Sequence, residues 1–181
     1  MAMRYINDWR ARGTNSLALL ALCASAIGLA SPAQADIIQI AAAAFAFRDS
    51  GAVGNAPYND RGLLYQGDGE YVAPVVFSTN GQFVCRFSLI YRDNDADNNI
   101  TARLHKKPFT LATNTAFGFT VVMAQVASSG ATQNTRKATT TAITQPGLNL
   151  GQAFYFAEIS IPDNAPVEVL GVQIDVRNTC P

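Results

Sequence analysis

The chain has 181 residues, of which 49% are hydrophobic, and its 13 basic side chains are balanced by 13 acidic ones. Because the charges balance and no basic stripe is present, we expect no nucleic-acid partner, since such binding needs a clustered excess of Lys and Arg. The length suits a single domain that is large enough to build its own core.

The N-terminal region has the pattern of a secretory signal. Three arginines precede an apolar run at positions 17–30, and a short stretch of small residues follows it. This order predicts cleavage after Ala35, so that residues 1–35 are removed and residues 36–181 form one exported domain, secreted or periplasmic. The apolar run is shorter than the roughly 20 residues that a spanning helix needs, so no transmembrane segment is expected after processing.

Beyond the signal, apolar and polar residues alternate with period two, which is typical of half-buried β-strands. Within the clearest alternation, we expect one face to carry core side chains: Phe83, Cys85, Phe87, Leu89 and Tyr91. In chain order the predicted strands are Ile37–Phe47, Tyr71–Phe77, Gln82–Arg92, a strand from Ile100, Phe117–Val126, Ala138–Ile143, Ala153–Ile161 and Val167–Val176. The parity of the apolar positions changes near Leu170 and Gly171, which predicts a β-bulge there.

A polar turn joins two of these strands. Asp93–Asn99 separates the strand Gln82–Arg92 from an alternation formed by Ile100, Ala102 and Leu104. This arrangement predicts a hairpin in which the second strand returns beside the first.

About eight strands and no helix predict an all-β protein, a single antiparallel β-sandwich that resembles a jelly roll. A closed β-barrel is the alternative architecture. Two stretches, Asp49–Gly69 and Ser128–Lys137, are predicted as long surface loops, which is also where binding residues often lie. Tyr58 and Tyr65 in the first loop are candidates for stacking on a sugar ring, whereas the other mature-chain tyrosines are assigned to the core or its edge: Tyr71, Tyr91 and Tyr155.

The mature chain keeps two cysteines, Cys85 in a predicted strand and Cys180 beside the C-terminus. In an exported protein this pair predicts a disulfide that ties the tail to the body. Two free thiols are the alternative. The spacing is not that of a Cys-x-x-Cys redox motif.

Three segments together resemble a loosely defined family of secreted bacterial domains. The segments read YVAPVVFSTNGQFV, FSLIYRDNDADNNITARLHKKP and FYFAEISIPDNAPVEVLGVQIDV, and the likeness extends over roughly Phe45–Val176. The family pattern is an APV strand, a YxDND hairpin and a closing GVxI strand. The resemblance implies a β-sandwich without an established activity, so no catalytic residue is transferred, and Cys180 lies beyond the pattern.

The acidic turn is a candidate calcium site. Asp93, Asp95 and Asp97 place carboxylates at alternate positions, as at the start of a calcium loop. Asn98 and Leu104 stand where an EF-hand has Gly and Glu, and the flanking segments are not helical. The alternative is an ordinary turn, because Asp and Asn bond their own backbone.

Titratable residues on the predicted strands are further candidates for chemistry. His105 is the single histidine, and its cationic neighbours predict a solvated position on an outer face. Glu158 and Asp175 are conceivable acid/base residues. Phe154, Phe156 and Glu158 share one face, so they form either an exposed, partly apolar patch or a face covered by a loop or sheet.

The function that these observations favour is a non-catalytic exported β-sandwich that acts in binding or in cell-envelope or surface structure. One alternative is an enzyme with a carboxylate site in a loop-lined cleft. The other is a calcium-dependent adhesion protein or a carbohydrate-binding module. The expected partner is an extracytoplasmic ligand such as a glycan or an envelope component, and calcium is the only candidate cofactor.

Overall fold

Strands make up most of the described part of the chain. The computed structural model describes residues 35–48, 64–65, 69–109, 120–162 and 166–181, which all belong to the unit Ala33–Pro181. Eight described strands have six or more residues: β1 (Asp36–Ala41), β4 (Gly69–Pro74), β5 (Phe83–Asp93), β6 (Thr101–Pro108), β7 (Val121–Ala127), β8 (Thr132–Thr140), β9 (Ala153–Ile161) and β10 (Val167–Arg177). Shorter elements are β2 (Ala46–Phe47), β3 (Leu64–Tyr65) and the 3-10 turn η1 (Ala42–Ala44). Within these residues we find no helix of the length and hydrophobicity that a membrane crossing requires.

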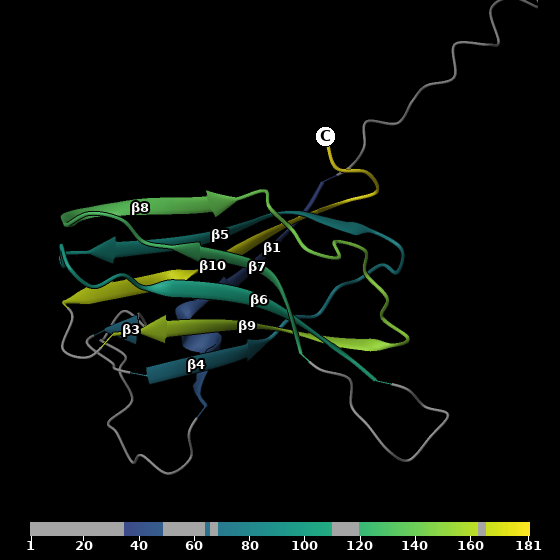
Figure 1. Ribbon diagram of the computed structural model, residues 1–181, viewed down its shortest axis with the longest axis horizontal. Helices are drawn as coiled ribbons and strands as arrows, with labels where there is room; N and C mark the ends of the chain where they lie inside the picture. The colour runs from purple at the N-terminus through teal and green to yellow at the C-terminus, as the bar shows by residue number, and fades with distance from the viewer. Residues whose placement is uncertain (1–34, 49–63, 66–68, 110–119, 163–165) are drawn as a thin grey trace, which may run out of the picture. The chain divides into compact units, whose positions relative to one another are not determined.

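The strands form two open antiparallel sheets (Figure 1). Sheet A has the order β1-β10-β5-β8, with β3 also paired to β10, and sheet B has the order β2-β4-β9-β6-β7. From β4 to β10, the chain changes sheet at every connection except the one between β6 and β7. This alternation between two sheets is the jelly-roll arrangement, which confirms the predicted sandwich over the closed alternative.

The core lies between the sheets, because each sheet contributes one face of apolar side chains to a single cluster. Phe87 and Leu89 of β5 come from sheet A, and Leu104 of β6 and Ile159 of β9 come from sheet B, each fully buried. Removing such apolar area from water is the main stabilising term of the fold, at roughly 25 cal/mol per Å². Polar residues alternate with these positions and therefore lie on the two outer faces.

The predicted hairpin around Asp93–Asn99 is wrong. β5 pairs with β10 and β8 in sheet A, while β6 pairs with β9 and β7 in sheet B. The turn therefore carries the chain across the core from one sheet to the other. Period-two alternation shows only that each strand buries one face, and it does not say which strand is its neighbour.

Two other predicted boundaries are corrected. Ile37–Phe47 is not one strand, because η1 breaks it and passes the chain from β1 in sheet A to β2 in sheet B. The predicted loop Ser128–Lys137 is largely strand, since β8 begins at Thr132 and hydrogen-bonds along the edge of sheet A. Most of β8 is exposed, so its sequence lacks the apolar alternation by which strands are found.

The predicted bulge in β10 is confirmed, and a second one lies on β5. Val169 pairs with Tyr91 and Gly171 with Ile90, which leaves Leu170 as the extra residue. Gly171 has φ +152°, and a Cβ at this position would overlap the carbonyl oxygen of Ile40 on β1. Glycine is therefore what allows β1 to pair closely with β10 at the bulge.

The second bulge corrects the expected core face of β5. Asp175 pairs with Arg86 and Val176 with Val84, so Cys85 is the extra residue. As a result Val84 is fully buried, whereas Phe83, which was expected in the core, is 38% exposed. One extra residue exchanges the faces of the side chains that lie beyond it, because successive side chains of a strand point to opposite faces.

Candidate functional site

The outer face of sheet B carries charged and aromatic side chains in cross-strand rows. In one row Val72 of β4 lies opposite Glu158 of β9, which lies opposite Arg103 of β6. In the next row Phe156 lies opposite His105. Directly opposed residues of antiparallel strands are close enough to interact, so register alone brings these groups together. We call the following set the sheet B site: Arg48, Arg103, His105, Lys107, Phe154, Phe156 and Glu158.

Glu158 is the centre of the charged part of this site. Its side chain is only 5% exposed, and both carboxylate oxygens accept hydrogen bonds from guanidinium groups. Arg103 Nη1 donates to Oε1 at 2.9 Å, and Arg48 Nη1 donates to Oε2 at 2.9 Å. A buried carboxylate needs such partners to offset the loss of hydration. Because both oxygens are occupied, Glu158 orients two arginines and is poorly placed to exchange protons with a substrate.

Each arginine is also held by a second acceptor. Arg48 Nη1 donates to Glu70 Oε2 at 2.7 Å, and Arg103 Nε donates to Gln125 Oε1 at 2.9 Å. Arg48 follows β2, and β2 pairs with β4, which carries Glu70. The network therefore ties the edge strands of sheet B to its centre.

The solvated position predicted for His105 is wrong, since this residue is only 7% exposed. Its ring stacks on Phe156 with centroids 4.7 Å apart and planes 9° apart. Nε2 lies 3.6 Å from Glu158 Oε1, which is longer than a hydrogen bond, and neither ring nitrogen has a hydrogen-bond partner among the described residues. The reason is that β6 is an inner strand of sheet B, so side chains of its neighbours cover its outer face.

The protonation state of His105 follows from this environment. Burial lowers the pKa of His105 below its ordinary value; the negative charge of Glu158 raises it in opposition, and the positive charges of Arg103 and Arg48 lower it further. The neutral imidazole is therefore the form that the folded protein favours near pH 7.

Beside the charged network lies a shallow hollow of about 480 Å³, the sheet B hollow. Its apolar lining includes Phe154 and Phe156, and Phe154 is 61% exposed. The ring of Phe109 packs against Phe154 with centroids 4.7 Å apart, which fixes the exposed ring in place. The other described residues that line the hollow are Arg48, Val72, Ala73, Pro74, Lys107, Thr120 and Tyr155. The face of Phe154, Phe156 and Glu158 was expected to be either an exposed, partly apolar patch or a covered face. The structure shows some of each, because Phe154 is exposed and Glu158 is buried.

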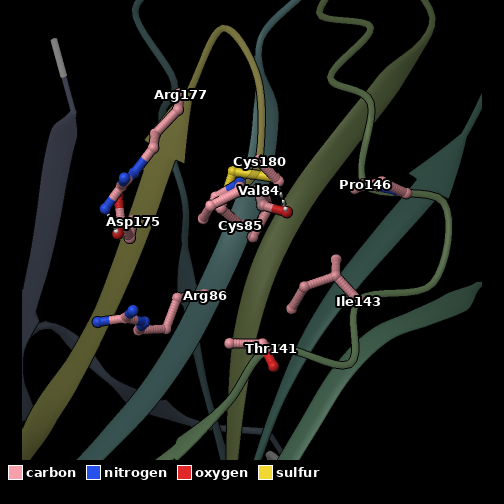
Figure 2. Close-up of a pocket in the computed structure, with 10 residues that line it drawn as sticks. Val84, Cys85, Arg86, Thr141, Ile143, Pro146, Asp175, Arg177 and Cys180 are labelled. Atoms are coloured by element: carbon pink, nitrogen blue, oxygen red, sulfur yellow. Dashed lines mark hydrogen bonds and ion pairs between the residues drawn. A yellow bond between two sulfur atoms is a disulfide. The ribbon is translucent and has the colours of Figure 1, made fainter. Parts of the chain in front are cut away.

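A second hollow, of about 250 Å³, lies on sheet A beside the disulfide (Figure 2). Cys85 and Cys180 are joined there with their sulfur atoms 2.00 Å apart. Figure 2 shows Asp175 between the side chains of Arg177 and Arg86. Arg177 donates to both oxygens of Asp175, at 3.1 and 2.7 Å, and these hydrogen bonds lower the pKa of the Asp175 carboxyl. The two acid/base candidates are thus on different sheets, and they do not form a pair.

The acidic turn uses its carboxylates to hold the crossing between the sheets. Asp93 is fully buried, and it accepts hydrogen bonds from the backbone N–H of Asp95 and from the hydroxyl of Ser128. Ser128 in turn accepts from the backbone N–H of Ile100 at 2.8 Å. These contacts connect the end of β5 to the segment that follows β7.

The second carboxylate of this turn also bonds locally. Asp95 accepts from the backbone N–H groups of Asp97 and Asn98 and from the Asn98 amide, and these donors lower the pKa of Asp95. Such bonds are those of the turn interpretation. In the described residues, no three His, Cys, Asp or Glu side chains gather in a way that could hold a metal ion, so the calcium site stays a prediction from the sequence.

The tyrosines divide as follows. Tyr71, Tyr91 and Tyr155 are each at most 5% exposed, which confirms their place in the core. Tyr65 lies in β3 with its backbone paired to Glu168, and Tyr58 lies outside the described residues.

The sequence singled out neither Arg48 nor Lys107 as a site residue, because their position at the hollow depends on the pairing of β2, β4, β9 and β6.

No protein-family model and no curated protein matches this chain. One similar solved structure is the CBM36-1 domain of a multidomain xylanase from the hindgut metagenome of Trinervitermes trinervoides, with 14% identity, a TM-score of 0.40, and coverage of 79% of this chain and 96% of that chain. Another is the xylan-binding module CBM15, with 9% identity, a TM-score of 0.46, and coverage of 79% and 97%. At such identities neither structure assigns a ligand to this chain.

Proposed function

We propose that this chain is an exported, non-catalytic β-sandwich protein that binds a glycan at the sheet B hollow. The observation that carries the proposal is the ring of Phe154, which is 61% exposed at a hollow of about 480 Å³ and is held there by Phe109. An exposed aromatic ring offers an apolar surface for the C–H face of a sugar ring. Arg48, Lys107 and Thr120 at the same hollow supply polar groups for sugar hydroxyls.

A binding role fits this hollow better than a hydrolytic one. Glycoside hydrolysis needs two carboxyl groups that flank the bond to be cleaved. Among the described residues that line the sheet B hollow there is no carboxylate, and Glu158 nearby is engaged by two guanidinium groups. The described part of the hollow therefore offers no acid/base pair for hydrolysis.

The test is affinity electrophoresis of residues 36–181 in gels that contain soluble xylan, β-glucan, mannan or polygalacturonate, followed by calorimetry with any polymer that retards the protein. We expect Phe154→Ala to weaken binding about tenfold or more, because it removes the stacking surface. Phe83→Ala is the matched control, since Phe83 is a partly exposed phenylalanine of sheet A. The proposal fails if no polymer retards the protein, or if both variants bind as the unaltered protein does.

A further inference from the structure

The charges at the sheet B hollow are of one sign. Among its described lining residues, Arg48 and Lys107 are cationic and none is acidic. Among the described residues, two carboxylates contact this lining, and both hold Arg48: Glu158, whose side chain is 5% exposed, and Glu70. With Arg103 included, three cations of this region face two carboxylates. The described residues at the hollow therefore include more cationic than acidic side chains.

The geometry of Arg48 makes part of its guanidinium available to a ligand. Both of its carboxylate contacts, to Glu70 and to Glu158, are made by Nη1. Nε and Nη2 donate no hydrogen bond to the residues that the structure describes, and the side chain is 55% exposed. Two carboxylates thus fix the orientation of the guanidinium through Nη1, and its Nε–Nη2 edge bonds none of the described residues. A planar donor pair of this kind matches a carboxylate, which can accept two parallel hydrogen bonds.

We propose that the ligand is an acidic polysaccharide that contains uronic acid residues; this inference rests on the proposed glycan-binding function. The pyranose ring packs on Phe154, and its carboxylate accepts hydrogen bonds from Nε and Nη2 of Arg48. Lys107 lies opposite Phe154 in the sheet register and adds a second positive charge on the β6 side of the ring. Glu70 and Glu158 act as positioning residues, because they hold Arg48 in the orientation that the carboxylate needs.

The experiment compares each acidic polymer with a neutral derivative of the same backbone. Binding of residues 36–181 is measured by calorimetry with polygalacturonate and with its methyl ester, and with glucuronoxylan and its carboxyl-reduced form. We expect each charged polymer to bind about tenfold or more tightly than its neutral form, since a charge-assisted hydrogen bond is stronger than one between neutral groups. The advantage should shrink as salt is raised, because the hollow is open to solvent.

Two variants locate the effect. Arg48→Lys keeps the charge but removes the donor pair, and Lys107→Gln removes a charge; each should reduce the preference for the charged polymer about threefold to tenfold. Lys137→Gln is the control, because it removes the same charge from the outer face of sheet A, where Lys137 bonds Gln173. Equal binding of charged and neutral polymers would overturn the inference and leave the glycan-binding proposal standing. Binding to neither kind, with no neutral polysaccharide retained, would overturn both.

Discussion

The two outer faces of the sandwich are built on different plans. On sheet A the polar side chains form separate pairs. Arg92–Glu168 and Ser88–Thr139 join neighbouring strands, and Lys137–Gln173 joins β8 to β10 across the intervening β5. On sheet B one buried carboxylate, Glu158, gathers two arginines and lies beside His105. Sheet B also exposes the ring of Phe154 next to this network.

The difference shows which face can accept a partner. Local pairs satisfy each other, so the described outer face of sheet A offers mainly side chains that already have acceptors or donors. A central carboxylate instead fixes long cationic side chains in defined orientations around an apolar surface. Preorganised polar groups beside an exposed aromatic ring are the usual composition of a ligand site. Four changes test this contrast.

The largest expected effect concerns the covalent link on sheet A. Replacing Cys85 and Cys180 together by serine should lower the free energy of unfolding by about 4 kcal/mol, because the disulfide joins residues 95 apart and restricts the unfolded chain. Urea unfolding followed by circular dichroism measures the change. Glycan binding below the unfolding transition should persist, since the disulfide is on the other sheet. Equal stability of the oxidised protein and the double variant would contradict the prediction.

The next test compares one carboxylate from each face. Glu158→Gln should lower the free energy of unfolding by about 2–3 kcal/mol, because it leaves two guanidinium groups without a buried counter-charge. Glu168→Gln on sheet A should cost less than about 1 kcal/mol, since its ion pair with Arg92 is partly exposed. Urea denaturation of both variants at pH 7 gives the comparison. Equal losses would show that the central network of sheet B is no more than a set of surface pairs.

A smaller effect is expected from pH. The folded-state pKa of His105 is below its ordinary value of 6.5, so on acidification the unfolded chain takes up the proton first. This contribution to stability is therefore complete above pH 6.5 and is lost as the pH falls through that value toward the folded-state pKa. Unfolding measured between pH 7.5 and 5.5 should show the decline, and His105→Gln should remove it, because the chain has a single histidine. A flat profile for the unaltered protein would refute the burial of His105.

The smallest effect belongs to Asp175 on sheet A. Its folded-state pKa is lowered by Arg177, so its contribution to stability is present above the ordinary value of 3.8 and is lost as the pH falls below it. Asp175→Asn should cost less than about 1 kcal/mol at pH 7, because Arg177 is accessible to water. Stability measured at pH 7 and at pH 3 should differ less in this variant than in the unaltered protein. The exposed Asp97, changed to Asn, is the control.

The sequence predicts the position of a strand well where the strand buries one face. It does not predict features that depend on which strands lie side by side. The strand Ala153–Ile161 was predicted with the bounds that β9 has, because its buried and exposed residues alternate. Only the C-terminal end of β8 falls within the predicted strand Ala138–Ile143, and its first six residues were predicted as loop because an exposed edge strand carries mostly polar residues. The sequence predicts only part of the sheet B site. Alternation places Phe154, Phe156 and Glu158 on one face of a strand, but it gives no position for Arg48 and Lys107 relative to them.

The sequence by itself determined the all-β class and the bulge near Leu170, because these follow from alternation along a single strand. It favoured a sandwich and left a closed barrel as the alternative, which the pairing of the strands then excluded. Only the tertiary structure decided that β5 and β6 belong to different sheets and that β6 is an inner strand beside β9. That placement buries His105 and places Glu158 beside Arg103. The pairing of β2 with β4 and of β4 with β9 brings Arg48 to Glu158 and to the hollow that Phe154 also lines. The physical reason is that strand pairing joins residues far apart in the chain, and alternation within one strand carries no information about which strand lies next to it.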